Sequence, residues 1–440
     1  MAAIGRHGVL TSTSAPSAIL LGCCAFGSLG YLIDDGVAQT TLYEIEAAGT
    51  GPAAPEDVRF DIPVEHPGVE HELLVAPGSG AEMSRPVDLR VQVTDETGQV
   101  LDDAHRLGLR VIAGLWLEPP RRGFDYRNRA AAEAQLKAIA AAVERHKRHP
   151  ALLMWGIGNE VEAELADDAA VWPAIEEAAR LVKSLDPAHP AMAVLAEAGG
   201  DKVRRLAARA PSIDVLGVNA YGDGLLSMPD RVRAQGWTGP IVVSELGALG
   251  QWQAGRTAWG AALEPSSTAK ADALRRYVPA IAAKTAGHLL FLWGHKQEVT
   301  PTWHSLLLES GEWTEAAEAM AQLWQGKTPG GNRAPRIVRL ATDPAPGWRP
   351  SEAGRATLEA SDPDGDAVAV EWTLLAESTD LKLGGDAEGR PAEFPRAVRR
   401  VDARQVAISG LAPGSYRIFA TVRDGKGAAA TANVPFRVGE

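Results

Sequence analysis

The chain has 440 residues, of which 45% are hydrophobic and 23% charged, so it is long enough for two or three globular domains with sizeable cores. Its formal net charge of −12 argues against a nucleic acid or an anionic membrane surface as partner, whereas a neutral polysaccharide remains compatible. The two cysteines, Cys23 and Cys24, are adjacent, and no zinc-type Cys/His spacing or phosphate-binding glycine loop is found. No disulfide framework, cofactor or metal is therefore expected.

Residues 1–30 contain a short apolar run that ends at Cys23. Residues 20–23, LLGC, resemble the cleavage box of bacterial lipoproteins, in which the cysteine becomes lipidated. The run is too short to span a bilayer as a helix. Two interpretations stay open: a leader without function, and a signal that predicts a secreted, periplasmic or lipid-anchored protein of the bacterial cell envelope. For residues 31–85 only short strands are predicted, at Val58–Val64 and His71–Val75.

Between residues 86 and 326, short apolar runs alternate with amphipathic helices, a pattern typical of a parallel α/β architecture. Strands are predicted at Val87–Val93, Arg110–Leu117, Ala151–Ile157, Ala191–Ala196, Asp214–Tyr221, Ile241–Glu245 and His288–Trp293. Helices are predicted at Gln99–Leu107, Ala130–His146, Ala170–Leu185, Lys202–Arg209, Pro229–Ala234, Ser267–Ala283 and Glu315–Gln325.

The predicted fold of this segment is a (β/α)8 TIM barrel. A closed barrel needs eight strands, and seven are predicted here. The first βα unit is therefore unclear or missing, and an open doubly wound sheet is the alternative. The barrel is preferred because the informative polar residues fall at the carboxyl ends of several strands, where such barrels build their active sites.

Two of the predicted strands end in a glutamate. The run ALLMWGI is followed by Gly158, Asn159 and Glu160, and the run PIVVS is followed by Glu245. Two carboxylates at one rim are what glycoside hydrolysis requires, one as acid/base and one as nucleophile. Other polar and aromatic residues complete the predicted constellation: Arg90, Trp116, Glu197, Asn219, Tyr221 and Trp293.

The stretches that carry these residues resemble retaining glycoside hydrolases of clan A, and most closely the TIM-barrel catalytic domain of glycoside hydrolase family 2. The likeness rests on Leu101–Leu117, His149–Glu162, Asp214–Gly222, Ile241–Trp252 and Phe291–Glu298. It implies a TIM barrel with the acid/base on the fourth strand and the nucleophile on the seventh.

The resemblance also implies a role for each matching residue. Glu160 would be the acid/base, Asn159 the binder of the sugar 2-hydroxyl and Glu245 the nucleophile. Tyr221 would contact the nucleophile, and Trp293 would lie under the sugar. Arg90 matches the second-strand arginine, although Val91 and Gln92 follow where the family has threonine and an aromatic residue. The remaining residues predicted to bind substrate are Trp116, Asn219 and Trp252, the last on the long loop after Glu245.

The predicted function is a retaining glycoside hydrolase or transglycosylase that cleaves β-glycosidic bonds of a polysaccharide or oligosaccharide. An inverting enzyme is one alternative, with carboxyl groups about 6.5–9.5 Å apart instead of about 5–5.5 Å. A catalytically impaired carbohydrate-binding protein with an incomplete barrel is the other. The expected partner is a β-linked glycan, with membrane attachment only through a lipidated Cys23. Sugar identity and oligomeric state are not predicted.

The segment 327–335 is rich in Gly and Pro and is predicted to be a linker. After it, residues 336–440 are predicted to form a β-sandwich that resembles fibronectin-III and PKD-like modules of bacterial extracellular enzymes. Its predicted strands are Ile337–Ala341, Arg355–Ala360, Ala367–Leu375, Val406–Ser409, Tyr416–Arg423 and Asn433–Val438. The alternating Asp362, Asp364 and Asp366 are compatible with calcium, but a plain acidic turn is favoured. A spacer role or attachment to a carbohydrate surface is expected for this module.

Overall fold

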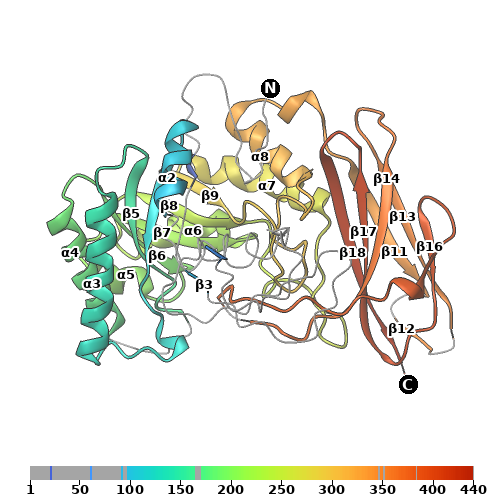
Figure 1. The fold of residues 1–440 in the computed structure, drawn as a ribbon, viewed down its shortest axis with the longest axis horizontal. Coiled ribbons are helices and arrows are strands. Elements are labelled where there is room, and N and C mark those ends of the chain that lie inside the picture. Colours follow the sequence, from blue (N-terminus) through green and yellow to red (C-terminus); the bar gives the residue numbers. More distant parts are fainter. Residues whose placement is uncertain are drawn as a thin grey trace, which may run out of the picture.

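The computed structural model describes residues 20–21, 60–61, 91–92, 97–163, 170–344, 347–349, 352–382 and 384–439. The predicted leader lies outside the described residues except for Leu20 and Leu21, and Arg90 also lies outside them. Two parts stand side by side in the molecule: a parallel sheet with helices, and a β-sandwich that follows it in the chain (Figure 1). Among the helices described, none combines the length and apolar character needed to cross a membrane.

The parallel sheet carries the predicted strand ends. Its strands pair in the order β1-β4-β5-β6-β7-β8-β9, and every pair is parallel. Their bounds are β1 (Leu20–Leu21), β4 (Arg110–Leu115), β5 (Leu152–Asn159), β6 (Ala191–Ala196), β7 (Val215–Tyr221), β8 (Ile241–Gly247) and β9 (Gly287–Leu290). The predicted fold class, a barrel-type βα domain followed by an all-β part, is confirmed by this curled parallel sheet and the sheets after it.

Helices alternate with the strands and cover the sheet (Figure 1). They are α2 (Thr97–Arg106), α3 (Arg129–His146), α4 (Val171–Leu185), α5 (Lys202–Arg209), α6 (Gly224–Ala234), α7 (Ser267–Ala282) and α8 (Glu315–Gln325). Local signals set several of their ends. The side chains of Asn128 and Ser266 accept hydrogen bonds from the first turns of α3 and α7. Gly326, at φ 65°, ends α8 in the left-handed conformation.

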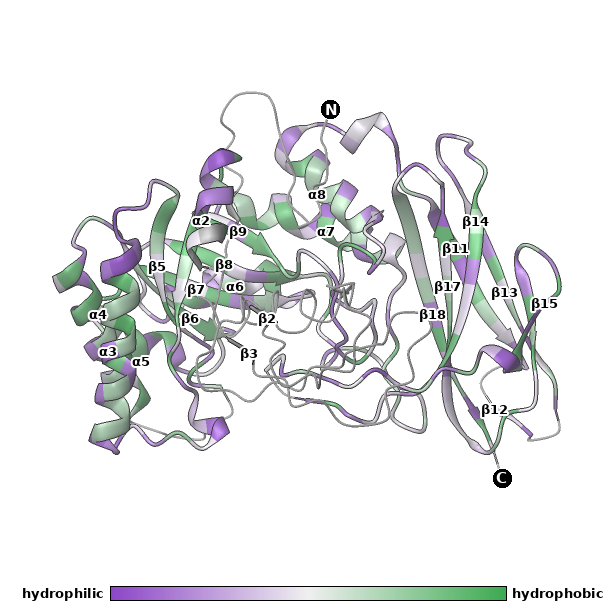
Figure 2. Ribbon diagram, in the orientation of Figure 1, coloured by the Kyte–Doolittle hydropathy of each residue, from purple (hydrophilic) through white to green (hydrophobic). Residues whose placement is uncertain are grey.

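The strand side chains divide between two apolar clusters. Ile112, Met192, Val215, Val242 and Leu289 come from five strands and form one cluster, so they share the inner face of the curled sheet. Their sequence neighbours belong to the larger cluster that includes the helices. The strands are therefore apolar on both faces, which Figure 2 shows as mainly green strands β5 to β8. Polar side chains that could bind a substrate or react with it are therefore expected at the ends of these strands.

Two predicted strands differ from the structure. β9 ends at Leu290 rather than at Trp293, so Trp293 lies in the loop that follows. The second difference concerns the predicted strand Val87–Val93, of which Val91–Gln92 is described as β3. It pairs with β2 (Phe60–Asp61) in a separate two-stranded sheet and does not join the main sheet.

The C-terminal part consists of two sheets with a shared core. One contains β11 (Arg336–Asp343), β13 (Gly354–Ser361), β15 (Val398–Arg400) and β16 (Gln405–Ile408). The other contains β10 (Trp313–Thr314), β12 (Gly347–Trp348), β14 (Ala369–Ala376), β17 (Gly414–Arg423) and β18 (Ala428–Val438). Trp348, Ile418 and Phe436 lie in the core between them. The hydroxyl of Tyr416 donates to the carbonyl of Ala412 at 2.9 Å.

Buried polar contacts join the sandwich to the βα part. Arg417, 2% exposed, donates to the carbonyl of Ala262 at 2.8 Å. The Asn433 amide donates to Glu264 at 2.6 Å. Strand β10, which precedes α8 in the chain, pairs with β18 of the sandwich. Since buried hydrogen bonds are costly to break, the two parts are held in one arrangement.

Candidate active site

Glu160 follows the last residue of β5 in a strained backbone conformation. Gly158 has φ 66° and Glu160 has φ 48°, both in the left-handed region. A Cβ on residue 158 would come within 2.4 Å of the Val161 side chain. The Glu160 amide donates to the carbonyl of Val194 on β6 at 3.1 Å. A non-glycine residue held at positive φ by its surroundings is often part of a functional site, and here it fixes where the carboxylate points.

Asn219 connects the ends of three strands. Its side-chain amide donates to Glu160 at 2.8 Å and to the side-chain oxygen of Asn159 at 3.1 Å. The Ser244 hydroxyl donates to the Asn219 oxygen at 2.7 Å, which fixes the orientation of the amide. Asn219 also pairs with Glu245 in the register of β7 and β8. The structure therefore brings together the predicted residues Asn159, Glu160 and Asn219.

Tyr221 contacts the second carboxylate. Its hydroxyl donates to Glu245 at 2.6 Å, and both side chains are buried. Burial raises the pKa of Tyr221 well above 10, and the charge of Glu245 acts in the same direction. The phenol therefore stays neutral and donates throughout the working pH range. A hydrogen bond to the charged form favours that form, so Tyr221 stabilises the ionised state of Glu245.

The two carboxyl groups influence each other. Burial raises the pKa of Glu160 above its ordinary value, and the charge of Glu162 adds to this. Burial also raises the pKa of Glu245, with the charge of Glu160 as the next cause. Two neighbouring carboxylates that repel each other lose their protons in separate steps. Over a range around neutral pH the pair therefore holds one proton.

An ion pair whose charges act on Glu160 joins Glu162 and Lys202. The Glu162 carboxylate accepts from Lys202 at 3.0 Å and from the backbone of Ala196 at 2.9 Å. Lys202 also donates to the carbonyl of Ala196. Glu162 is 4% exposed, and burial raises its pKa while the charge of Lys202 lowers it.

Residues after β9 enclose Tyr221. The rings of Phe291 and His304 lie 6.1 Å and 5.5 Å from the Tyr221 ring, both edge-on. Burial lowers the pKa of His304 to about 4, so its imidazole is neutral at neutral pH. Phe291 and His304 were not predicted as residues of this site, because their loop has no regular spacing that indicates which side chains turn inward.

The other predicted residues take different positions. Trp252 is 59% exposed, and its ring lies 5.1 Å from that of Tyr221, at the edge of the site. Trp116 is partly buried, donates to Glu118 and lies under the Arg122 guanidinium. Trp293 packs against the main apolar cluster. No contact that the structure describes joins Trp116 or Trp293 to the two carboxylates, so their substrate roles stay predictions.

Glu197 does not join this group. Although it also follows a strand and has φ 70°, both of its oxygens accept from the Arg231 guanidinium at 2.6 Å. This bidentate ion pair links β6 to α6 and gives Glu197 a structural partner.

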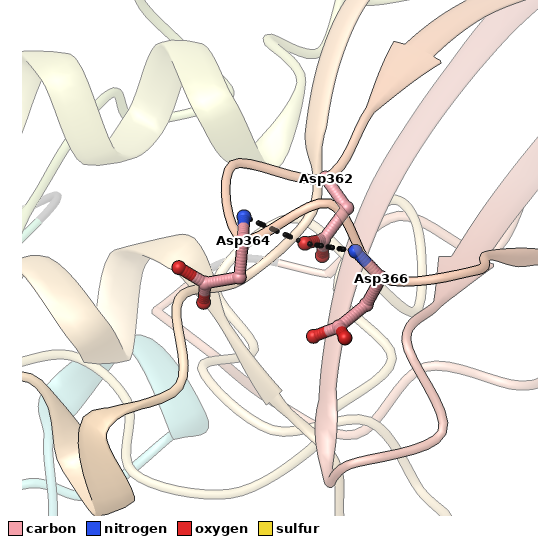
Figure 3. Close-up of side chains that lie close together, drawn as sticks. All are labelled: Asp362, Asp364 and Asp366. Atoms are coloured by element: carbon pink, nitrogen blue, oxygen red, sulfur yellow. Dashed lines mark hydrogen bonds between the residues drawn. The ribbon is translucent and has the colours of Figure 1, made fainter.

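The DPDGD turn forms an acidic cluster in the sandwich (Figure 3). One ligand oxygen each from Asp362, Asp364 and Asp366 lies within 4.8 Å of the others. Asp362 accepts from the amides of Asp364 and Asp366. Asp364 pairs with Arg333 at 2.7 Å and Asp366 with Lys426 at 2.6 Å. Arg333 and Lys426 therefore pair with two of the three carboxylates of this turn.

Residues 89–223 match the family described as "Glycosyl hydrolases family 2, TIM barrel domain". The resemblance predicted from the sequence is thereby confirmed for the part that contains Asn159, Glu160, Asn219 and Tyr221. No curated protein matches the chain.

The chain is also similar to several solved structures. A β-glucuronidase of an uncultured Clostridium species shares 16% identity over 52% of this chain and 42% of its own, with a TM-score of 0.39. A β-D-glucuronidase of Dictyoglomus thermophilum shares 18% identity over 52% and 43%, with a TM-score of 0.40. A family 2 β-galacturonidase of Eisenbergiella tayi, bound to galacturonate, shares 18% over 54% and 44%, also with 0.40. The matched part of this chain spans less than half the length of each of these proteins.

Proposed function

We propose that this chain is a retaining glycoside hydrolase or transglycosylase acting on β-linked glycans, with Glu160 as acid/base and Glu245 as nucleophile. One observation carries the proposal. Asn219 and Tyr221, two residues apart on β7, donate to Glu160 and Glu245 respectively. A single strand thus orients two carboxyl groups, Glu245 buried and Glu160 half-buried, whose charges influence each other, as a double-displacement glycosidase requires.

The partners of each carboxyl group act on its ionisation. Tyr221 donates to Glu245, and the nearby charge of Lys296 also favours its ionised form. The negative charges of Glu162 and Glu298 oppose the ionised forms of Glu160 and Glu245 respectively, while Asn219, Lys202 and Arg121 favour ionised Glu160. These influences act on both groups, so we take the roles from the resemblance to family 2. It makes Glu160 the general acid, which holds the proton of the resting enzyme, and leaves Glu245, bound by Tyr221, as the anionic nucleophile.

In the proposed reaction, Glu160 gives its proton to the glycosidic oxygen while a Glu245 oxygen attacks the anomeric carbon. The leaving alcohol departs, and an ester joins the sugar to Glu245. Glu160, now a carboxylate, takes a proton from water, which attacks the anomeric carbon and releases Glu245. A sugar hydroxyl in place of water gives transglycosylation. Asn159 would hydrogen-bond the 2-hydroxyl, a contact that strengthens in the transition state.

The proposal is tested with a panel of aryl β-glycosides and β-glucans. Glu245→Gln and Glu160→Gln should each lose at least about 10³-fold in kcat on the best substrate. Glu197→Gln is a matched control, because Glu197 also follows a strand at positive φ but binds Arg231. It should keep its activity. A 2-fluoro glycoside should label Glu245, as mapped by mass spectrometry, and the first product should retain the anomeric configuration.

Other results would replace the proposal. If Glu245→Gln keeps full activity, or the label falls elsewhere, the nucleophile assignment is wrong. Inversion at the anomeric carbon would favour the inverting alternative. If wild type and variants are inert on the whole panel but bind glycans, the chain is a carbohydrate-binding protein.

We also propose that the protein is exported and anchored through Cys23. The LLGC sequence at residues 20–23 supports this. In a bacterial host, wild type should partition with membranes and incorporate labelled fatty acid, and Cys23→Ser should not. Equal behaviour of both would contradict the anchor.

A further inference from the structure

One loop of the sandwich reaches the βα part. Residues 384–393, here called the sandwich loop, lie between β14 and the short helix η3 (Pro395–Ala397). In Figure 1 this orange-red segment extends from the sandwich toward the helical part. Its contacts go to two loops, one after β4 and one after β9.

The first contact is with the loop after β4. Asp386 accepts from Arg121 at 3.1 Å and also binds Arg122. The carbonyl of Gly384 accepts from Arg121 at 3.4 Å. Gly384 has φ 58°, and a Cβ there would lie 2.5 Å from the Arg121 guanidinium. The Arg121 side chain is therefore held closely against the sandwich loop.

The second contact is with the loop after β9. The Lys296 ammonium, 1% exposed, donates to the carbonyl of Gly385 at 2.7 Å. One oxygen of Glu388 accepts from the backbone amide of Val299 at 2.6 Å, and the other accepts from the amide of Lys382 at 3.1 Å. Val299 has φ 60°, so Glu388 holds a strained turn in place. Glu388 is 9% exposed.

A continuous series of contacts leads from this loop to the nucleophile. Lys296 pairs with Glu298 at 3.0 Å. Glu298 accepts from Gln251 at 2.8 Å, and Gln251 contacts His304 at 3.0 Å. The His304 ring packs against Tyr221, which donates to Glu245.

The contact of the sandwich loop with Arg121 bears on Glu160, the proposed acid/base. The charge of Arg121 acts on Glu160. The remaining charged groups that act on this pair are Glu162 and Lys202 at Glu160, and Glu298 and Lys296 at Glu245. Two of these five groups, Arg121 and Lys296, are bound directly by the sandwich loop.

We infer that the sandwich loop is a positioning element of the active site: Asp386 and Glu388 hold the two barrel loops that flank Glu160 and Glu245. The sandwich is then a part of the catalytic unit, in addition to any role as spacer or attachment module. This inference rests on the proposed function for its kinetic consequences, whereas the holding of the two loops is a structural claim that stands apart from it.

The test uses three variants of the full chain. Asp386→Asn weakens the bond to Arg121, and Glu388→Gln leaves one of two backbone amides without its carboxylate acceptor. Glu393→Gln is the matched control, because Glu393 lies in the same loop, its side chain is 45% exposed, and the described contact of that side chain is a 3.9 Å ion pair with Arg390. The first readout is hydrogen–deuterium exchange. The second is the pH profile of kcat and KM on the best aryl glycoside.

Glu388→Gln should speed exchange in residues 294–304 by about fivefold and lower kcat about tenfold with little change in KM. In Asp386→Asn, Arg121 is less neutralised and favours ionised Glu160, so the basic limb of the profile should move to lower pH. A role in stability alone would reduce the fraction of folded protein without moving that limb. Glu393→Gln should match wild type in both readouts.

Two results separate the inference from the proposed function. If the wild type turns over no glycan, the proposed function fails, and exchange alone decides: faster exchange in Glu388→Gln than in Glu393→Gln supports the positioning element. If exchange in residues 294–304 and the kinetics of Asp386→Asn and Glu388→Gln match those of Glu393→Gln, the inference is overturned.

Discussion

The side-chain amide of Asn219 donates a 2.8 Å hydrogen bond to the Glu160 carboxylate, although the two residues belong to strand ends separated by β6. The backbone of Asn219 is at the same time paired in register with Glu245. Asn219 is 3% exposed. One buried residue therefore contacts Glu160 through its side chain and Glu245 through the strand register, and its amide shapes the environment of the Glu160 carboxylate.

We expect Asn219→Asp to be strongly impaired. The new carboxylate would replace a donor by a like charge next to Glu160, which further raises the pKa of Glu160. A loss of about 10²-fold in kcat/KM is expected, with the basic limb of its pH profile at higher pH. Ser244→Ala should have a smaller effect in the same assay, because it removes only the hydrogen bond that orients the amide. An unchanged basic limb in Asn219→Asp would contradict this assignment.

Tyr221→Phe removes the hydrogen bond to Glu245. Since that bond favours the ionised carboxylate, its loss raises the pKa of Glu245, and the acidic limb of the kcat/KM profile should move to higher pH by about one unit. Activity at the optimum should fall about 10- to 100-fold, because hydrogen bonds to charged groups are worth about 1.5–3 kcal/mol. The measurement is a pH series on one aryl glycoside. A profile that drops in height without moving would show that Tyr221 does not set the ionisation of Glu245.

Glu245→Gln should be more stable than wild type at alkaline pH. A carboxyl group whose pKa is raised in the folded state binds protons more tightly there than when unfolded, so folding becomes less favourable as the pH rises above 4.5. The amide removes this penalty and can still accept from Tyr221. We expect a gain of about 1–3 kcal/mol in the free energy of unfolding at pH 8 and little difference at pH 4. Denaturant titrations at both pH values measure it, and an equal gain at both would point to a cause other than ionisation.

Gly158→Ala should disrupt the turn that carries Glu160. Its φ of 66° disfavours a side chain, and the new Cβ would lie 2.4 Å from Val161 and 3.1 Å from Leu117. Strain and overpacking together should cost about 3 kcal/mol. Gly123→Ala is the matched control: φ is 90° with no atom within 4 Å of the new Cβ, so only about 1 kcal/mol is expected. Thermal unfolding of both variants tests this, and equal losses would mean that contact with Val161 is unimportant.

Trp252→Ala should affect substrate binding more than chemistry. The side chain is exposed and makes a T-shaped contact with the Tyr221 ring, so it can offer a flat surface to a sugar beside Glu245, the proposed nucleophile. We expect KM to rise about fivefold with kcat nearly unchanged. Leu263→Ala, another exposed apolar residue (46%), serves as control. A fall in kcat without a change in KM would place Trp252 in the catalytic step.

Local patterns in the sequence determined the elements and the two strand ends. The apolar runs before Glu160 and Glu245 are continuous because these strands are covered on both faces, and the caps at Asn128, Ser266 and Gly326 act within one helical turn. These signals depend on neighbouring residues only, so they can be read without the fold. The family match over residues 89–223 confirms the resemblance for the part of the chain that includes the strand end at Glu160.

The tertiary structure alone decided which side chains meet. The Asn219 amide could have faced several partners, Glu197 also follows a strand but pairs with Arg231, and Trp293 was placed in a strand that ends earlier. The residues of the sandwich loop that bind Lys296 and Val299 each lie 89 positions away from them in the chain. Such contacts arise from the packing of two domains and have no local signature, because neither partner needs the other to form its own strand, turn or helix.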